Sequence, residues 1–143
     1  MVDRFEVKGA RELERKLQRL SAAASGRAIR TAVGFAMTPV LKEARSNAPI
    51  GTTSHKTHKG RVVAPGFLSR SIKKKTKLSR NKGSAFAWIQ ADSEAFYGRY
   101  TEKGTVNITA QPWLRPAMKD NKRLVKNRYA DKLRDRIRIE AAK

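Results

Sequence analysis

The sequence predicts an α+β fold, in which two N-terminal helices and a C-terminal helix pack on a small, mainly antiparallel sheet. Apolar residues recur at helical spacing over 10–24, 27–48 and 118–141, whereas 71–78 and 84–92 alternate in polarity. The turn sequence Arg80-Asn81-Lys82-Gly83 separates the two alternating segments and favours a hairpin. A length of 143 residues suits one domain, residues 1–143, with a long basic loop at about 50–66.

The first predicted helix runs from Ala10 to Ala24. Its leucines Leu13, Leu17 and Leu20 fall on one face, and charged residues cover the rest. Ser25-Gly26 is expected to end it, because glycine is common just after a helix.

The second predicted helix runs from Arg27 to Ala48 and carries a broader apolar stripe. Pro39 lies inside this pattern and predicts a kink near Met37–Thr38, since an interior proline removes a helix hydrogen bond. The short link at Gly26 predicts that the first two helices pack as an antiparallel pair.

Alternating polarity predicts the strands. We expect an edge strand at Asp3–Lys8, a hairpin of Ser71–Leu78 with Ser84–Asp92, and a short further strand at Val106–Thr109. Apolar residues on both faces of Ser84–Asp92 predict a central strand. The third long helix is expected at Met118–Ala141.

The segment 96–118 contains two of the five prolines, two of the three tyrosines and one of the two tryptophans. Pro112 fits the first turn of a helix, with Trp113 and Leu114 as apolar anchors. We therefore expect a fixed corner between the sheet and the last helix. Tryptophan, tyrosine and arginine are common at subunit contacts, so the candidate oligomer or partner interface comprises Tyr97, Tyr100, Glu102, Gly104, Thr105, Pro112, Trp113, Leu114, Arg115 and Pro116.

The charge is strongly positive, with 33 lysines and arginines against 12 acidic residues, a net charge of +21. No acid occurs from Arg45 to Lys82, a span with 11 basic residues. Such a chain meets polyanions or an acidic partner, or stays soluble by repulsion. Candidate nucleic-acid or acidic-partner contacts are Lys56, Lys59, Arg61, Lys73, Lys74, Lys75 and Lys77. The alternative, a solvated face that resists edge-to-edge pairing, remains open.

The sequence shows little sign of chemistry. It has no cysteine, and its only histidines, His55 and His58, have no acid within ten residues. A metal-dependent nuclease using Asp92, Glu94 and Glu102 is a minor alternative. No apolar run reaches the roughly 18 residues of a membrane span, and the N-terminus lacks the apolar region of a signal peptide. We expect no catalytic residues, metal, cofactor, small-molecule substrate or membrane.

An ordered set of short motifs then suggests a family. A leucine-stripe helix is followed by Ala44-Arg45-Ser46-Asn47-Ala48-Pro49, by Leu68-Ser69-Arg70-Ser71-Ile72, by Tyr97 or Tyr100 before Glu102-Lys103-Gly104-Thr105, and by Ala110 with Pro112-Trp113-Leu114-Arg115-Pro116-Ala117. This layout resembles the tail-completion, or head–tail joining, proteins of tailed bacteriophages.

The resemblance implies a non-enzymatic virion protein, made in the host cytoplasm, that forms a homo-oligomeric ring, commonly of six, at the neck. It also implies a tail-tube or terminator protein and neck or head-closure proteins as partners, with genomic double-stranded DNA in the lumen. The basic loop and the high net charge depart from the family's usual pattern. The alternative function is non-sequence-specific nucleic-acid binding.

Overall fold

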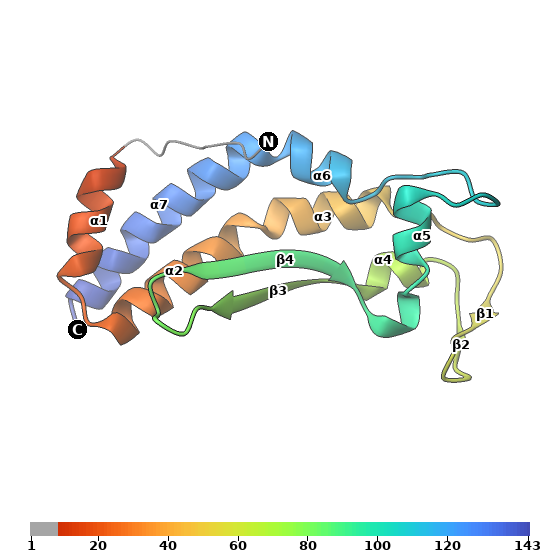
Figure 1. Ribbon diagram of the computed structural model, residues 1–143, viewed down its shortest axis with the longest axis horizontal. Coiled ribbons are helices and arrows are strands. Elements are labelled where there is room, and N and C mark those ends of the chain that lie inside the picture. The colour runs from red at the N-terminus through yellow and green to blue at the C-terminus, as the bar shows by residue number, and fades with distance from the viewer. Residues whose placement is uncertain (1–8) are drawn as a thin grey trace. The chain divides into compact units, whose positions relative to one another are not determined.

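The computed structural model describes residues 9–143, so the strand expected at Asp3–Lys8 lies outside the described residues. The chain forms two compact units. The first comprises 9–38, 75–88 and 122–143, and the second 39–74 and 89–121. The single domain expected at 1–143 stays a prediction. The α+β class is confirmed (Figure 1).

The first unit is built around α2 (Ala22–Ala36) and α7 (Lys122–Ala141), which pack side by side and run in opposite directions (Figure 1). Small residues on α2, Ala28 and Ala32, are fully buried and allow α7 to come close. The core contains them together with Leu13, Ile29, Leu133 and Ile137. The predicted apolar stripes of the first and last helices therefore meet in one core.

The first helix ends earlier than expected. α1 spans Ala10–Gln18, and Ser21 begins α2 by accepting a hydrogen bond from the Ala24 N–H (3.2 Å). Gly26 lies inside α2, where a Cβ would stand 2.9 Å from Leu78 Cδ2, so the glycine makes room for a strand. The antiparallel pairing expected through Gly26 is thus wrong, because the main helical partner of α2 is α7.

The break predicted near Met37–Thr38 is confirmed. α2 ends at Ala36, Met37 is a turn, and α3 spans Thr38–Asn47. Pro39 is the second residue of α3, where its missing N–H has no helical partner to lose.

The hairpin of β3 (Ile72–Leu78) and β4 (Ala85–Ala91) is confirmed. The Asn81 Oδ1 accepts a hydrogen bond from the Gly83 N–H (3.0 Å) in the turn, as its side-chain chemistry predicts. In the described part of the chain β4 pairs only with β3, so the expectation of a central strand is not met there.

The second unit contains α3, α4 (Phe67–Ser71), the 3-10 turn η1 (Ser93–Ala95), α5 (Gly98–Lys103) and α6 (Arg115–Asp120). The basic loop at 50–66 includes a small antiparallel hairpin, in which β1 (His55–Lys56) pairs with β2 (Val62–Val63). Its order comes from this pairing and from the Thr57 N–H, which donates to the Arg61 carbonyl (2.8 Å).

Two expectations for the C-terminal half are wrong. Residues 106–109 form a turn region instead of a strand, and Pro112 precedes the helix, which begins at Arg115 with Pro116 in its first turn. The long C-terminal helix is also interrupted. Asn121 separates α6 from α7, and its side-chain amide donates to the Ala117 carbonyl (2.8 Å) and to the Glu43 carboxylate.

Two motifs that carried the family resemblance meet in this unit. The Arg45 guanidinium donates from Nε (3.0 Å) and Nη2 (2.8 Å) to the Ile72 carbonyl, and the Ser69 hydroxyl donates to the Arg45 carbonyl (2.8 Å). The segment at the end of α3 is thereby fixed to the start of β3.

Candidate functional site: a carboxylate-anchored corner

Glu102 holds the corner of the second unit together. Its Oε2 accepts hydrogen bonds from the backbone N–H groups of Trp113 (2.6 Å) and Leu114 (2.9 Å), and its Oε1 accepts from that of Arg115 (3.0 Å). The side chain is only 10% exposed. The carboxylate at the end of α5 therefore fixes the chain where it enters α6, 11 to 13 residues later.

The electrostatics of Glu102 follow from the same contacts. Burial raises the pKa of its carboxyl, whereas the three backbone hydrogen bonds and the charge of Arg115 lower it. The lowering effects prevail, so the pKa lies below that of an ordinary glutamate. Glu102 is therefore a charged anchor at neutral pH.

Trp113 is the second fixed point of the corner, but it is only 4% exposed. Its indole N–H donates to the Gly98 carbonyl (2.9 Å). A Cβ at Gly98 would lie 2.6 Å from Cδ1 of the buried Leu68 and 3.5 Å from the indole, so α5, α4 and Trp113 meet closely here. Trp113 thus positions the corner from inside, and its assignment to a subunit contact stays a prediction.

The loop between α5 and α6 is closed at its base. Gly104 has φ 75° and ψ 163°, a conformation that essentially only glycine adopts, and a Cβ there would lie 2.9 Å from the Ala110 nitrogen. The Thr105 N–H donates to the Ile108 carbonyl (2.8 Å), and the Gln111 N–H donates to the Thr101 carbonyl (2.7 Å). The loop is thus held by its own backbone as well as by Glu102.

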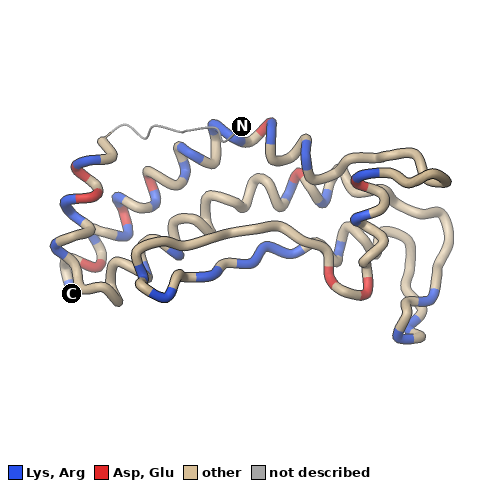
Figure 2. The backbone as a smooth tube through the Cα atoms, in the orientation of Figure 1, with Lys and Arg blue, Asp and Glu red and all other residues tan. Residues whose placement is uncertain are grey.

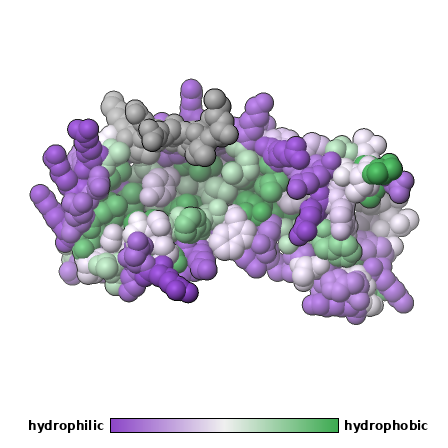
Figure 3. Space-filling model, viewed as in Figure 1, coloured by the Kyte–Doolittle hydropathy of each residue, from purple (hydrophilic) through white to green (hydrophobic). Residues whose placement is uncertain are grey.

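The tip of this closed loop is apolar. Val106 is fully exposed, and Ile108 is 44% exposed. The loop ends in a hydrophobic tip at the right of the space-filling view (Figure 3). A stiff loop that presents aliphatic side chains to solvent is a surface suited to contact with another protein.

Aromatic side chains lie beside the corner. The Tyr97 ring meets His55 edge-on (5.4 Å between centroids), and Phe96 meets His58 (6.0 Å) and Tyr100 (6.3 Å) in the same way. Burial raises the pKa of the Tyr97 hydroxyl. Both histidines of the basic loop therefore pack on aromatic rings of the same unit.

Figure 2 marks the lysines and arginines along the backbone in blue. The predicted basic contacts differ in their exposure and in their ion pairs. Lys56 and Lys59 are exposed at the β1–β2 hairpin. Arg61 approaches Glu94 (3.5 Å) and lies over the Phe67 ring (5.5 Å from guanidinium carbon to centroid). In β3, Lys73 pairs with Asp92 (2.9 Å) and Lys74 is half-buried.

Lys75 and Lys77 belong to the first unit and are exposed on the outer face of the hairpin. The Ser79 N–H bonds to the Ser84 carbonyl and the Asp92 N–H to the Ser71 carbonyl. These bonds lie eight residues apart on each strand, so a regular register places Lys77 opposite Phe86 and Lys75 opposite Trp88. Phe86 is 59% and Trp88 38% exposed, which makes this face both basic and aromatic.

The acidic residues of the nuclease alternative each have other partners. Glu102 accepts three backbone N–H groups, Asp92 pairs with Lys73, and Glu94 approaches Arg61. Within residues 9–143, no group of three or more histidine, cysteine or acidic side chains could hold a metal ion. Nor is any helix there both long and apolar enough to cross a membrane.

The sequence indicated Glu102, Gly104 and Trp113 as candidate site residues. It did not predict the hydrogen bond from the Trp113 N–H to the Glu102 carboxylate. The aliphatic tip was not predicted, because the polarity pattern of 106–109 favoured a strand. The spacing of Glu102 before the Pro112-Trp113 pair was the available signal, since a carboxylate can accept the free N–H groups at the start of a helix.

A fixed corner that presents an exposed apolar tip is a surface suited to contacts with other proteins. Residues 11–104 match the family model described as "Bacteriophage HK97-gp10, putative tail-component". The chain belongs to this family. Comparisons with curated proteins and with solved structures gave no match. The family supports a structural role related to the phage tail, association with the virion, and contacts with other virion proteins.

Proposed function

We propose that this chain is a tail-completion, or head–tail joining, subunit that assembles into a closed ring at the phage neck, with genomic DNA passing through the ring. A head-to-tail contact between identical subunits closes into a ring when the rotation allows it. The observation that carries the proposal is the fully exposed Val106 on a loop fixed by Glu102 and Gly104.

The hydrogen bonds at the base of the loop support the role proposed for it. An aliphatic tip on a loop held by its own hydrogen bonds loses little conformational freedom on binding. More of the favourable free energy of burying the tip then contributes to affinity. No residue of the second unit covers Val106, and its burial against a partner together with Ile108 would remove apolar surface from water. A neighbouring copy or another neck protein is the expected cover.

The test is complementation of a phage that lacks this gene. Val106→Asp places a charge at the tip without touching the core, so the protein should fold but fail to restore complete virions. Leu124→Asp is the matched control, because Leu124 is an exposed aliphatic residue on α7 (46% exposed). Electron microscopy should show unjoined heads and tails with the first variant and complete particles with the second. Complete particles with Val106→Asp would contradict the proposed role of the tip.

A second candidate function is non-sequence-specific binding of nucleic acid by the outer face of the β3–β4 hairpin. The alignment of Lys75 and Lys77 with two exposed aromatic rings favours it. Gel retardation of duplex and single-stranded DNA should weaken steeply with salt, and Lys75→Glu with Lys77→Glu should reduce the salt slope. Failure of the wild-type protein to retard DNA at low salt would remove this candidate.

A further inference from the structure

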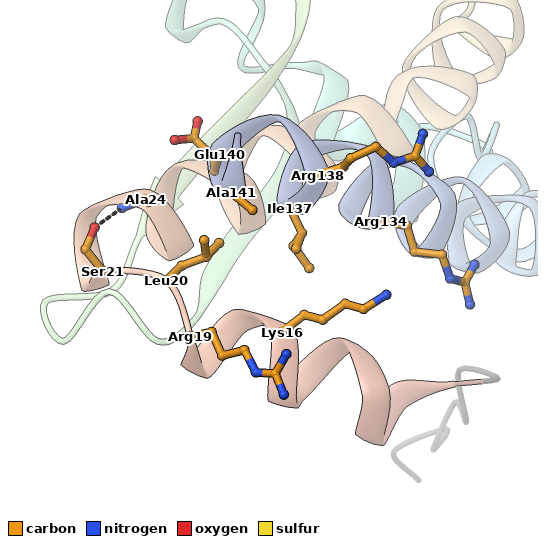
Figure 4. Close-up of a pocket in the computed structure, with 10 residues that line it drawn as sticks. All are labelled: Lys16, Arg19, Leu20, Ser21, Ala24, Arg134, Ile137, Arg138, Glu140 and Ala141. Atoms are coloured by element: carbon orange, nitrogen blue, oxygen red, sulfur yellow. Dashed lines mark hydrogen bonds between the residues drawn. The ribbon is translucent and has the colours of Figure 1, made fainter. Parts of the chain in front are cut away.

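A basic cleft lies between α1 and α7 in the first unit (Figure 4). Its volume is about 580 Å³. Four basic side chains line it: Lys16 from α1, Arg19 from the turn that directly follows α1, and Arg134 and Arg138 from α7. Its apolar lining includes Leu20, Ala24, Ile137 and Ala141.

The cleft keeps a positive charge although Glu140 lines it. The Glu140 carboxylate is 1% exposed and is surrounded by Arg27 (2.9 Å), Arg136 (3.0 Å) and Lys143 (3.3 Å). These cations neutralise it, and in Figure 4 its carboxylate points away from the side chains of α1. The hydrogen bond from Arg27 is the main reason why the pKa of Glu140 is lowered, so this acid stays ionised within its own network.

Two of the basic groups at the cleft have acidic neighbours on their own helices. Lys16 pairs with Glu12 (2.8 Å), and Arg134 pairs with Asp131 (3.2 Å). Arg19 and Arg138 form no ion pair with any residue from 9 to 143. These two guanidinium groups are therefore the sites at which an anionic ligand gains most, because it need not displace an internal partner.

The lining limits the chemical class of the ligand. A free phosphate would use the cations but not the aliphatic surface of Leu20 and Ile137. A peptide that carries carboxylates beside an aliphatic side chain uses both. We propose that this cleft binds an acidic segment of another protein, with one aliphatic side chain against Leu20 and Ile137 and carboxylates on Arg19 and Arg138. This inference does not rest on the proposed ring.

The test uses the purified full-length protein and a fluorescent peptide of glutamate and leucine residues. Fluorescence anisotropy should show saturable binding that weakens with salt. Arg19→Glu and Arg138→Glu should each weaken it about three- to tenfold, because each removes one attraction and adds one repulsion. Arg123→Glu is the matched control, since Arg123 is exposed on α7, lies outside the cleft and changes the net charge equally. Circular dichroism checks that every variant is folded.

Two further probes separate the cleft from general attraction to a basic protein. A peptide of glutamate and glycine with the same charge should bind at least about fivefold more weakly, because it has no aliphatic anchor. Equal binding of the two peptides, or an equal effect of Arg123→Glu, would overturn the proposal. So would a short DNA duplex that binds with the same dependence on Arg19 and Arg138, because the cleft would then be a site for polyanions in general.

Discussion

Replacement of Glu102 tests the corner most directly. In Glu102→Ala the backbone N–H groups of Trp113, Leu114 and Arg115 lose their acceptor. A buried N–H left without a partner costs about 1–3 kcal/mol, and hydrogen bonds to charged groups are the stronger ones. The Trp113 N–H is buried, whereas water can reach those of Leu114 and Arg115 in part. We therefore expect a loss of about 3–5 kcal/mol in the free energy of unfolding.

Glu102→Gln should cost less, for a geometric reason. Its amide oxygen can replace Oε2 and keep the bonds from Trp113 and Leu114, whereas its NH₂ group faces the Arg115 N–H and cannot accept from it. One bond and the negative charge are lost, so we expect a decrease of about 1–2 kcal/mol.

Urea unfolding followed by circular dichroism measures both variants, and hydrogen exchange of the amides at 113–115 reports on the corner itself. Glu12→Gln is the control, because the Glu12 side chain is 70% exposed and pairs with Lys16 on the surface. It should change stability by less than about 0.5 kcal/mol. The reasoning is refuted if Glu102→Ala behaves like this control, or if Gln is as damaging as Ala.

Three other perturbations are informative. Gly104→Ala should lower the free energy of unfolding by about 1–3 kcal/mol, because alanine is strained at this φ and ψ and its Cβ meets the Ala110 nitrogen. Thermal unfolding measures this loss of stability. An unchanged stability would show that the loop relaxes easily. Because the pKa of Glu102 is lowered in the folded state, its stabilisation is complete above the ordinary carboxyl pKa of about 4.3 and is lost as pH falls through the lower folded value. Wild-type stability should thus fall more steeply in acid than that of Glu102→Gln, and parallel profiles would argue against a charged anchor. Phe35→Leu should cost about 0.5–1 kcal/mol beyond lost area, because the Arg128 guanidinium lies 4.1 Å from the ring centroid; a double-mutant cycle with Arg128→Gln measures the coupling.

Local patterns in the sequence predicted much of the fold. The alternation and the turn at Asn81 to Gly83 predicted the hairpin, and Pro39 predicted the break between α2 and α3, because these signals act between near neighbours in the chain. The helix end predicted at Gly26 was wrong, because the role of this glycine depends on a residue far away in the chain. Gly26 has no side chain and so leaves room for Leu78, which is 52 positions away in the chain. Helix rules that consider only neighbouring residues cannot predict this contact.

The amino-acid sequence by itself determined the +21 charge, the apolar stripes, the hairpin and the motifs that indicated a phage tail protein. Only the tertiary structure decided which of the selected residues lie inside and which face solvent. Glu102 is buried because it accepts hydrogen bonds from three backbone N–H groups 11 to 13 residues away. Trp113 is buried and donates its indole N–H to the Gly98 carbonyl, whereas Val106 is exposed. Burial depends on which remote segments come together, and residue type fixes only what each side chain can do once it is there.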